Sequence, residues 1–360
     1  MSPRIIEAWQ TALRRQRLSA VPLKDDEQLW NRVCAACDFL PAAYTPAWVR
    51  YQLTYLLAFS DDVVDLSCTV VREQEPLAVI PLVLRRVDGA WSLGSNEGPV
   101  LQPLFARGQG EKTRRSLYQA LFEVFAALNT DLWCSEILVG GGGFNDWHHQ
   151  IAPHVQEVQL RHELYVDLLL EPSAIWSNIR RRYKSLISEA RRSWTIEVLG
   201  PGSNEAFEEF RLLHVAVAGR ETRPKSTWEM QRDAIASNAA FLVTLREPGG
   251  RLVGGGLFHT SAHEGVYAVG AYDRTLFDKP LGHAVQMRAI EYMQSQGLRW
   301  FRIGTRPYPF DRPAPSDKEL SIGHFKAGFA THVFPRVESR IRMKSSPSTT
   351  GLSGARSADQ

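Results

Sequence analysis

Hydrophobic positions in the first half of the chain alternate between helical and strand-like spacing. Apolar residues at intervals of three and four predict helices over residues 5–16, 26–37, 46–55 and 112–128. Continuous or alternating apolar runs predict strands over residues 66–72, 76–86, 90–94 and 132–139. Asp88-Gly89 is typical of a tight hairpin turn, so the three strands before residue 95 are expected to form an antiparallel meander.

The second half repeats this order with a stronger pattern. Strands are predicted over residues 164–170, 194–199, 240–246, 252–259, 265–272 and 299–303. Helices are predicted over residues 173–192, 204–218, 227–237 and 281–296. The longest of these, residues 173–192, carries an apolar stripe of Ile175, Ile179, Tyr183, Leu186 and Ala190.

Both halves therefore show three antiparallel strands, one helix and one further strand, although their residues are not obviously similar. We interpret them as two copies of one α/β fold with a mixed sheet, over residues 1–160 and 161–340. Residues 341–360, and most clearly those after residue 344, are rich in Ser, Thr, Gly and Ala and predict a disordered tail.

Composition limits the possible functions. The 360 residues include 42 Lys and Arg against 39 Asp and Glu, a net charge of +3, so no general attraction to nucleic acid is expected. The start of the chain predicts an amphipathic helix, and no apolar run approaches the length of a membrane span, so a cytoplasmic protein is expected.

Residues that could bind a metal ion are sparse. Cys34 and Cys37 lack a second ligand pair and fall inside a helical pattern, so we interpret them as structural. His148 and His149 have no carboxylate or Cys partner at metal spacing and are assigned to a loop, and no metal is expected. Gly140 to Gly143 lack the Lys-Ser/Thr of a phosphate-binding loop and are interpreted as a flexible connection.

The turn from Lys279 to Ala284 is the most informative candidate site. It lies between a predicted strand and a predicted helix, where free backbone N–H groups attract an anion and Gly282 allows a phosphate to approach the main chain. The spacing resembles the turn by which GNAT enzymes hold the pyrophosphate of coenzyme A, with Lys279 in the first position. A structural role is equally open, because Pro and Gly are common at helix starts.

Three stretches together resemble the FemAB-like branch of the GNAT-like acyltransferases, which has two such domains in tandem. They are the basic helix around Ile179 to Leu186, the strands and turn that end at Gly304, and Ser321 to Phe329, which is similar to the family's Phe-Lys-x-x-Phe-Gly element. Ala330 replaces the final Gly of that element. The resemblance covers about residues 165–335 and is faint in the first half.

The resemblance implies an N-acyltransferase that moves an acyl group from acyl-CoA, a co-substrate rather than a permanently bound cofactor, onto an amine. The implied acceptor is an amine of a cell-envelope precursor such as an amino sugar, as in polysaccharide biogenesis. Aminoacyl-tRNA is the alternative donor, although the sequence lacks the coiled-coil heptads of relatives that use it. A binding protein that has lost its chemistry is the other alternative, and the oligomeric state stays open.

Several residues are expected at the site. Lys326 matches the family's Lys beside the acyl carbonyl, although a surface Lys between two core aromatics is equally open. His259, Tyr267 and Tyr272 on the predicted strands are candidates for proton transfer, although packing within the strands explains each of them as well. Main-chain contacts to coenzyme A are expected from Lys279, Leu281, Gly282, His283 and Ala284. The basic residues Arg180 and Lys184 and the charged loop with Arg220, Glu221 and Arg223 are expected to bind the substrate, although solvated surface explains both groups as well.

Overall fold

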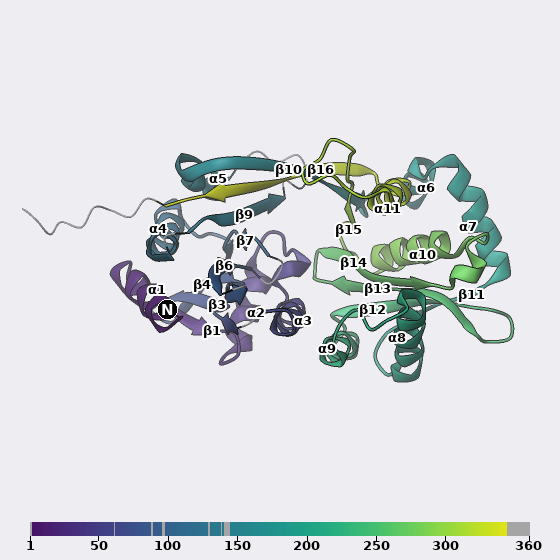
Figure 1. The fold of residues 1–360 in the computed structure, drawn as a ribbon, viewed down its shortest axis with the longest axis horizontal. Helices are drawn as coiled ribbons and strands as arrows, with labels where there is room; N and C mark the ends of the chain where they lie inside the picture. The colour runs from purple at the N-terminus through teal and green to yellow at the C-terminus, as the bar shows by residue number, and fades with distance from the viewer. Residues whose placement is uncertain are drawn as a thin grey trace, which may run out of the picture.

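In the computed structural model, the two halves lie side by side and are joined by one continuous sheet (Figure 1). The structure describes residues 2–343 except residues 61, 88, 96–97, 129, 138 and 140–144. Asp88 of the predicted hairpin turn, the Gly140 to Gly143 segment and the predicted tail from Lys344 onwards lie outside the described residues.

The first half begins with helices and ends with a long strand. Its helices are α1 (Ser2–Arg15), α2 (Glu27–Ala36), α3 (Pro46–Leu57), α4 (Glu111–Leu128) and α5 (Asp146–Ile151), with 3-10 turns η1 (Ala42–Tyr44) and η3 (Ala152–His154). Its strands are β1 (Ser19–Pro22), β2 (Asp62–Asp65), β3 (Cys68–Arg72), β4 (Glu75–Ile80), β5 (Val83–Val87), β6 (Ala90–Gly94), β7 (Val100–Leu101), β8 (Leu104–Phe105) and β9 (Leu132–Ile137).

The first half ends with β10 (Val155–Asp167), and the second half follows it. Its helices are α6 (Pro172–Asn178), α7 (Arg181–Ser193), α8 (Asn204–Ala218), α9 (Lys225–Ala236), α10 (Leu281–Ser295) and α11 (Asp317–Ala327), with the 3-10 turn η4 (Arg274–Leu276). Its strands are β11 (Thr195–Leu199), β12 (Ala240–Arg246), β13 (Leu252–Thr260), β14 (Glu264–Tyr272), β15 (Trp300–Thr305) and β16 (His332–Ile341).

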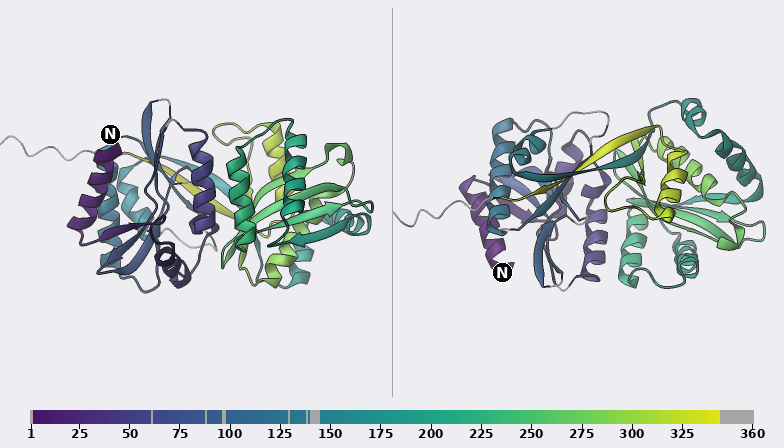
Figure 2. Two further views of the ribbon diagram at one scale, coloured as in Figure 1. Left: turned by 90° about the horizontal axis from the view of Figure 1, so that it is seen from below. Right: turned by 45° about the horizontal axis from the view of Figure 1, so that its top comes forward.

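The halves exchange their last strands. β10, which ends the first half, pairs with β15 of the second half, whereas β16, which ends the second half, pairs with β9 of the first. β10 and β16 also pair with each other and cross from one half to the other (Figure 2). The predicted boundary at residue 160 falls inside β10, so the division into residues 1–160 and 161–340 stays a prediction.

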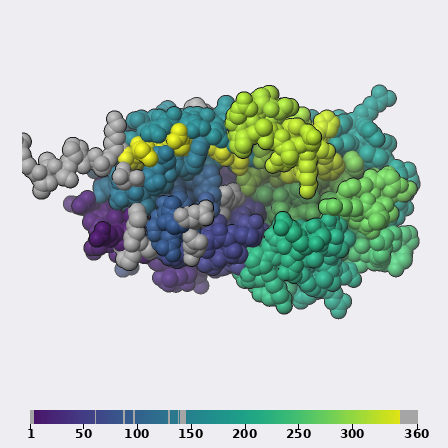
Figure 3. All heavy atoms as spheres, viewed as in Figure 1, coloured from purple at the N-terminus to yellow at the C-terminus, as the bar shows by residue number. Residues whose placement is uncertain are grey.

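Helices cover both faces of the sheet in the second half (Figure 1). One face packs against α7 and α10 through a core that includes Ile187, Phe241 and Val285. The other face packs against α8 and α9 through Phe210 and Trp228. In the space-filling view the atoms of the two halves adjoin each other along this face (Figure 3). No helix within the described part of the chain is long and apolar enough to cross a membrane.

The fold confirms the predicted α/β architecture of two similar halves and corrects several elements. The strand predicted over residues 76–86 is two strands, because the chain breaks at Pro81, which has no N–H for a sheet. β5 and β6 therefore join β2 in a separate sheet instead of extending a meander. The helix predicted over residues 173–192 is interrupted at Ile179 and Arg180, where ψ is 135° and 130°.

Candidate active site

The sheet of the second half opens between its two parallel strands. β14 and β15 pair only from Glu264 opposite Trp300 to Val266 opposite Arg302, and they separate beyond that point. In β14 the register against β13 shifts, so that Tyr267 faces Phe258 and Val269 faces Leu257. Ala268 is left between these pairs as a bulge, which changes the alternation of side chains along β14.

The bulge places two tyrosines on the same face of the sheet. The hydroxyl oxygens of Tyr267 and Tyr272 are 3.2 Å apart. Burial raises the pKa of both phenols, and the side chain of Gln286 from α10 lies beside Tyr267. Both tyrosines therefore stay protonated near neutral pH and are able to donate a hydrogen bond or a proton.

Lys326 reaches the opening from α11. Its Nζ lies 5.6 Å from the centre of the Tyr267 ring. A Cβ atom added to Gly304, which has a φ of +128°, would lie only 2.6 Å from the same Nζ. Burial lowers the pKa of Lys326, and the Glu163 carboxylate opposes this shift. The structure thus brings Lys326, Tyr267 and Tyr272, three of the four predicted candidates, to one place.

The start of α10 adjoins this group. A Cβ atom on Gly282 would lie 3.2 Å from the Phe325 ring and 3.5 Å from the Tyr272 ring, so the glycine allows close packing here. The side chains of Leu281 and Ala284 are buried in the core, which leaves only their main-chain groups for a ligand. Lys279 is exposed and lies 3.5 Å from Asp278.

Cationic side chains from α7 flank the same helix start. His283 packs between the rings of Tyr183 and Phe325, at 4.5 Å and 5.1 Å. Burial, together with the nearby charges of Arg182 and Arg180, lowers the pKa of His283 to about 4. The helix start therefore has a neutral imidazole and two guanidinium groups beside it, a setting that favours an anion.

The predicted substrate-binding residues fall into two places. Arg180 donates to the Tyr183 hydroxyl at 2.9 Å and to the His324 carbonyl at 3.1 Å, which keeps it beside α10. Lys184 lies on the next turn of α7 and donates to the Ser177 carbonyl at 3.0 Å. Arg180 therefore lies beside the start of α10, whereas the contact of Lys184 is with α6.

The charged loop lies elsewhere, between α8 and α9. Arg223 donates to the Tyr51 hydroxyl of α3 at 2.8 Å, and Glu221 lies 3.8 Å from Arg211. Arg220 is exposed. The loop thus contacts the first half and is not brought together with Lys326.

His259 lies at the same contact between the halves. Its ring packs 4.7 Å from Trp48 and 5.8 Å from Tyr51, and both ring nitrogens are buried without a hydrogen-bond partner among the described residues. Burial lowers its pKa to about 3. His259 pairs with Val266, and Phe258 pairs with Tyr267, so His259 faces the opposite side of the sheet from Tyr267.

The loop predicted around His148 is wrong. His148 lies in α5, where Asn145 caps the helix, and its Nδ1 is 2.8 Å from Oε2 of Glu136. The carboxylate partner that the sequence did not reveal is thus twelve residues earlier, on β9. Cys34, Cys37, Cys68 and Cys134 are free and buried. Within the described ranges, no three His, Cys, Asp or Glu residues group as a metal site would require.

Sequence reasoning missed Gln286 and Gly304. Gln286 is a fully buried amide on the apolar side of α10, between Val285 and Met287. A single amide among apolar residues of a predicted helix was the feature of the sequence that could have indicated a functional role. Gly304 ends the predicted strand, and its contact with Lys326 depends on tertiary packing that no local pattern encodes.

Comparisons with known proteins support the fold. No protein-family model matches the chain. No curated protein matches it. The crystal structure of FemX is similar over 89% of this chain and 96% of its own, with 13% identity and a TM-score of 0.65. A conserved protein of unknown function from Bacteroides thetaiotaomicron is similar over 90% of this chain and 99% of its own, with 7% identity and a TM-score of 0.56.

A third structure extends this likeness. The C-terminal domain of a putative lysylphosphatidylglycerol synthetase from Agrobacterium fabrum is similar over 87% of this chain and 91% of its own, with 12% identity and a TM-score of 0.50. At these identities the likeness concerns the fold. The chain thus shares the fold of FemX, in agreement with the FemAB-like fold that the sequence predicted.

Proposed function

We propose that the chain is an N-acyltransferase whose reaction centre is the opening between β14 and β15. The observation that supports this proposal is the placement of Lys326 against Gly304 and Tyr267, where the parallel strands separate. The tandem fold is shared with FemX, and that likeness is compatible with the proposal.

The proposed chemistry needs no covalent enzyme intermediate. A neutral amine attacks the acyl carbonyl, a C–N bond forms, and the bond from the carbonyl carbon to the leaving sulfur breaks. The Lys326 ammonium stabilises the negative charge that develops on the carbonyl oxygen. Tyr272, kept protonated by burial, supplies a proton to the leaving thiolate, and solvent accepts the proton that the amine loses.

Acyl-CoA is the donor we propose. The pyrophosphate would lie at the start of α10, on the main chain of Gly282, His283 and Ala284, because helix starts carry N–H groups without intrahelical partners. Leu281, which the sequence also suggested, already donates its N–H to the Lys279 carbonyl at 3.0 Å. Arg180 and the exposed Lys279 would balance its charge. Gly282 next to Tyr272 connects this anion site to the reaction centre.

The acceptor we propose is an amine of a cell-envelope precursor such as an amino sugar. This part rests on the family resemblance. Lys184, next to Arg180 on α7, is a candidate contact. Arg220, Glu221 and Arg223 are candidates from the loop that meets the first half, where an acceptor that extends between the halves would reach them. His259 is buried in the same contact, on the opposite side of the sheet from Tyr267, so the proposed proton transfer does not use it.

Release of free thiol from a panel of acyl-CoAs, with glucosamine as the amine, tests this proposal. Lys326→Ala should lower kcat by roughly 100-fold or more, since it removes an electrostatic stabiliser of the transition state. Lys318→Ala, an exposed lysine on the same helix, is the matched control and should leave kcat unchanged. Thermal unfolding of each variant verifies that it is folded.

Other outcomes decide between the alternatives. If no acyl-CoA binds or reacts, the coenzyme A donor is wrong, and charged transfer RNA is the next donor to assay. If neither donor reacts with the folded protein, the chain is a binding protein with an acyltransferase fold. If Lys326→Ala and Lys318→Ala behave alike in an active enzyme, the assigned centre is wrong.

A further inference from the structure

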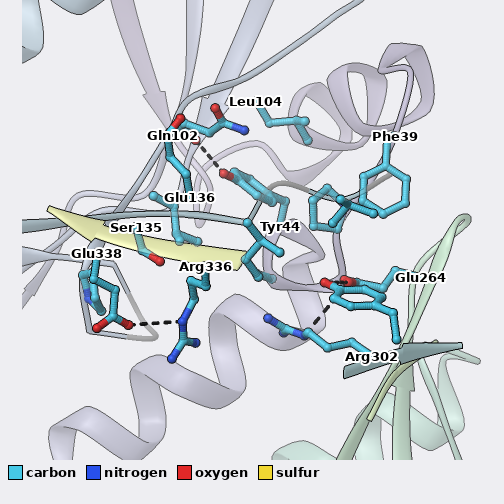
Figure 4. A pocket seen from close by; sticks show the side chains of 17 residues that line it. Phe39, Tyr44, Gln102, Leu104, Ser135, Glu136, Glu264, Arg302, Arg336 and Glu338 are labelled. Carbon is cyan, nitrogen blue, oxygen red and sulfur yellow. Dashed lines mark hydrogen bonds and ion pairs between the residues drawn. The ribbon is translucent and has the colours of Figure 1, made fainter. Parts of the chain in front are cut away.

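A pocket lies between the two halves. It adjoins the place where the parallel strands β7 and β9 of the first half separate, which corresponds to the opening between β14 and β15 in the second half. β7 and β9 are parallel and pair only at Val100 with Cys134 and at Leu101 with Ser135. Where they separate, a cavity of about 340 Å³ begins (Figure 4). Its walls include Phe39, Leu101, Ser135, Glu136, Arg302 and Arg336. This volume suits a small molecule.

Glu136 is a lining residue with one carboxylate oxygen that accepts no hydrogen bond from the described residues. Its side chain is 3% exposed, and Oε2 lies 2.8 Å from His148 Nδ1. Oε1 is buried and has no hydrogen-bond partner among the residues that the structure describes. A buried carboxylate oxygen without a donor is costly, on the order of 1–3 kcal/mol or more. A ligand that brings a donor to Oε1 would remove this cost.

The other charged groups of the pocket are already engaged with each other. Glu264 accepts hydrogen bonds from the Tyr165 hydroxyl at 3.0 Å and from the Ala42 N–H at 2.8 Å, and Arg302 lies 4.0 Å away. Figure 4 shows Glu264 and Arg302 close to the green strands of the second half.

Arg336 is the second guanidinium group that lines the pocket. It lies 3.1 Å from Glu338 and 3.0 Å from Glu163. Three carboxylates, those of Glu136, Glu264 and Glu338, line the pocket against the two guanidinium groups of Arg302 and Arg336. Two further partners lie outside the lining, Glu163 on Arg336 and His148 on Glu136. Among the residues that line the pocket, carboxylates outnumber guanidinium groups, so a cationic ligand suits it better than an anionic one.

We propose that this pocket binds a small primary amine, with its ammonium group on Oε1 of Glu136. The charge balance favours an amine without a carboxylate of its own. Apolar walls from Phe39, Leu104 and Ile137 favour a short hydrocarbon body. An amino acid amide meets both requirements, because it has an α-amine, no carboxylate and a short hydrocarbon side chain.

The site is separate from the proposed reaction centre. The pocket includes Arg302, which pairs with Val266, whereas Tyr267 faces the core on the other side of the sheet. Lys326 lies over Tyr267 and does not line the pocket. Amine binding therefore does not depend on acyl transfer, and Lys326→Ala should bind the amine as the unaltered chain does.

Calorimetric titration of the full chain with L-leucinamide tests the proposal. We expect one molecule bound per chain. Glu136→Gln, which keeps the side-chain size and removes the charge, should weaken binding at least tenfold, or about 1.4 kcal/mol. Glu123→Gln, an exposed first-half carboxylate paired with Arg15, is the matched control and should not change the affinity.

Two analogues and a second variant complete the test. L-leucine adds a carboxylate and 4-methylpentanamide lacks the amine, so each should bind at least tenfold more weakly than L-leucinamide. Leu104→Trp should fill the pocket and abolish binding while Glu136 stays intact. The proposal is overturned if L-leucinamide fails to bind at about 10 mM, if Glu136→Gln binds as tightly as the unaltered chain, or if the amine-free amide binds equally well.

Discussion

The two halves repeat one order of elements but place different chemistry where their parallel strands separate. In both, the helix that follows the second parallel strand delivers a basic side chain to the opening. In the second half α11 brings Lys326 against Gly304, with Tyr267 and Tyr272 nearby. In the first half α5 brings His148 onto Glu136. His148 is paired with a carboxylate, whereas Lys326 lies over a tyrosine ring, and this difference is why the proposed reaction centre is assigned to the second half.

The helix before that strand differs as well. α4 of the first half begins with Glu111, an acidic residue in its first turn, whereas α10 has none. A carboxylate at a helix start interacts with the same N–H groups that would hold a phosphate. The start of α4 thus carries a carboxylate, which pairs with Arg115, whereas the first turn of α10 carries no acidic residue.

The largest effect is expected at Gly304. Gly304→Ala places a Cβ atom 2.6 Å from Lys326 Nζ and so displaces the ammonium group. The rate of acyl transfer should fall roughly 100-fold, as for loss of a transition-state donor. The left-handed φ of +128° adds a loss of about 1–3 kcal/mol in the free energy of unfolding. Steady-state kinetics and urea unfolding measure the two effects.

Gly297 separates backbone strain from displacement of Lys326. It has a φ of +75° and no atom within 4 Å of an added Cβ. Gly297→Ala should therefore lose stability similarly and keep the rate of acyl transfer. Equal loss of rate in both variants would mean that strain alone explains the Gly304 effect, and that the second half does not rely on the position of Lys326.

The pH dependence of the rate is the next largest effect. Burial lowers the pKa of Lys326 from its ordinary value near 10.5. If the ammonium form is the active one, kcat/KM should fall about tenfold per pH unit above that lowered pKa. The arginine of the Lys326→Arg variant keeps its charge throughout this range. The variant should therefore show no decline of kcat/KM at alkaline pH, even if its maximal rate is lower. An identical alkaline decline in both proteins would contradict the role of Lys326.

The sequence predicted the elements of the second half well because their patterns are local. α8 and β12 agree with the predicted bounds, and the stripe of Ile175, Ile179 and Tyr183 is buried. In contrast, β10 begins nine residues before the strand predicted at Leu164. That early part alternates between half-buried and exposed residues and is stabilised by pairing with β16, more than 170 residues away in the chain.

The candidate site was predicted in part for the same reason. The start of α10 and Lys326 belong to local motifs, and the structure places both beside the pair of Tyr267 and Tyr272. His259 was predicted from its strand alone. Whether a strand residue faces α10 or α3 depends on register, and the contact with Trp48 crosses between the halves. The Glu136–His148 pair likewise joins a strand to a helix that no spacing rule connects.

The smallest effect is expected from a substitution at the start of α10. Gly282→Asp would give α10 an acidic residue in its first turn, as α4 has. Gly282→Asp adds a carboxylate where the proposed pyrophosphate lies, so KM for acyl-CoA should rise roughly tenfold, since removal of a favourable anion contact of 1–2 kcal/mol corresponds to that ratio. Gly282→Asn is the matched control, because it meets Phe325 in the same way without the charge. The two variants should share any loss of kcat due to crowding and differ in KM. If Gly282→Asp and Gly282→Asn raise KM equally, Gly282 acts through its small size. The difference in acidic residues between the starts of α4 and α10 would then be unrelated to donor binding.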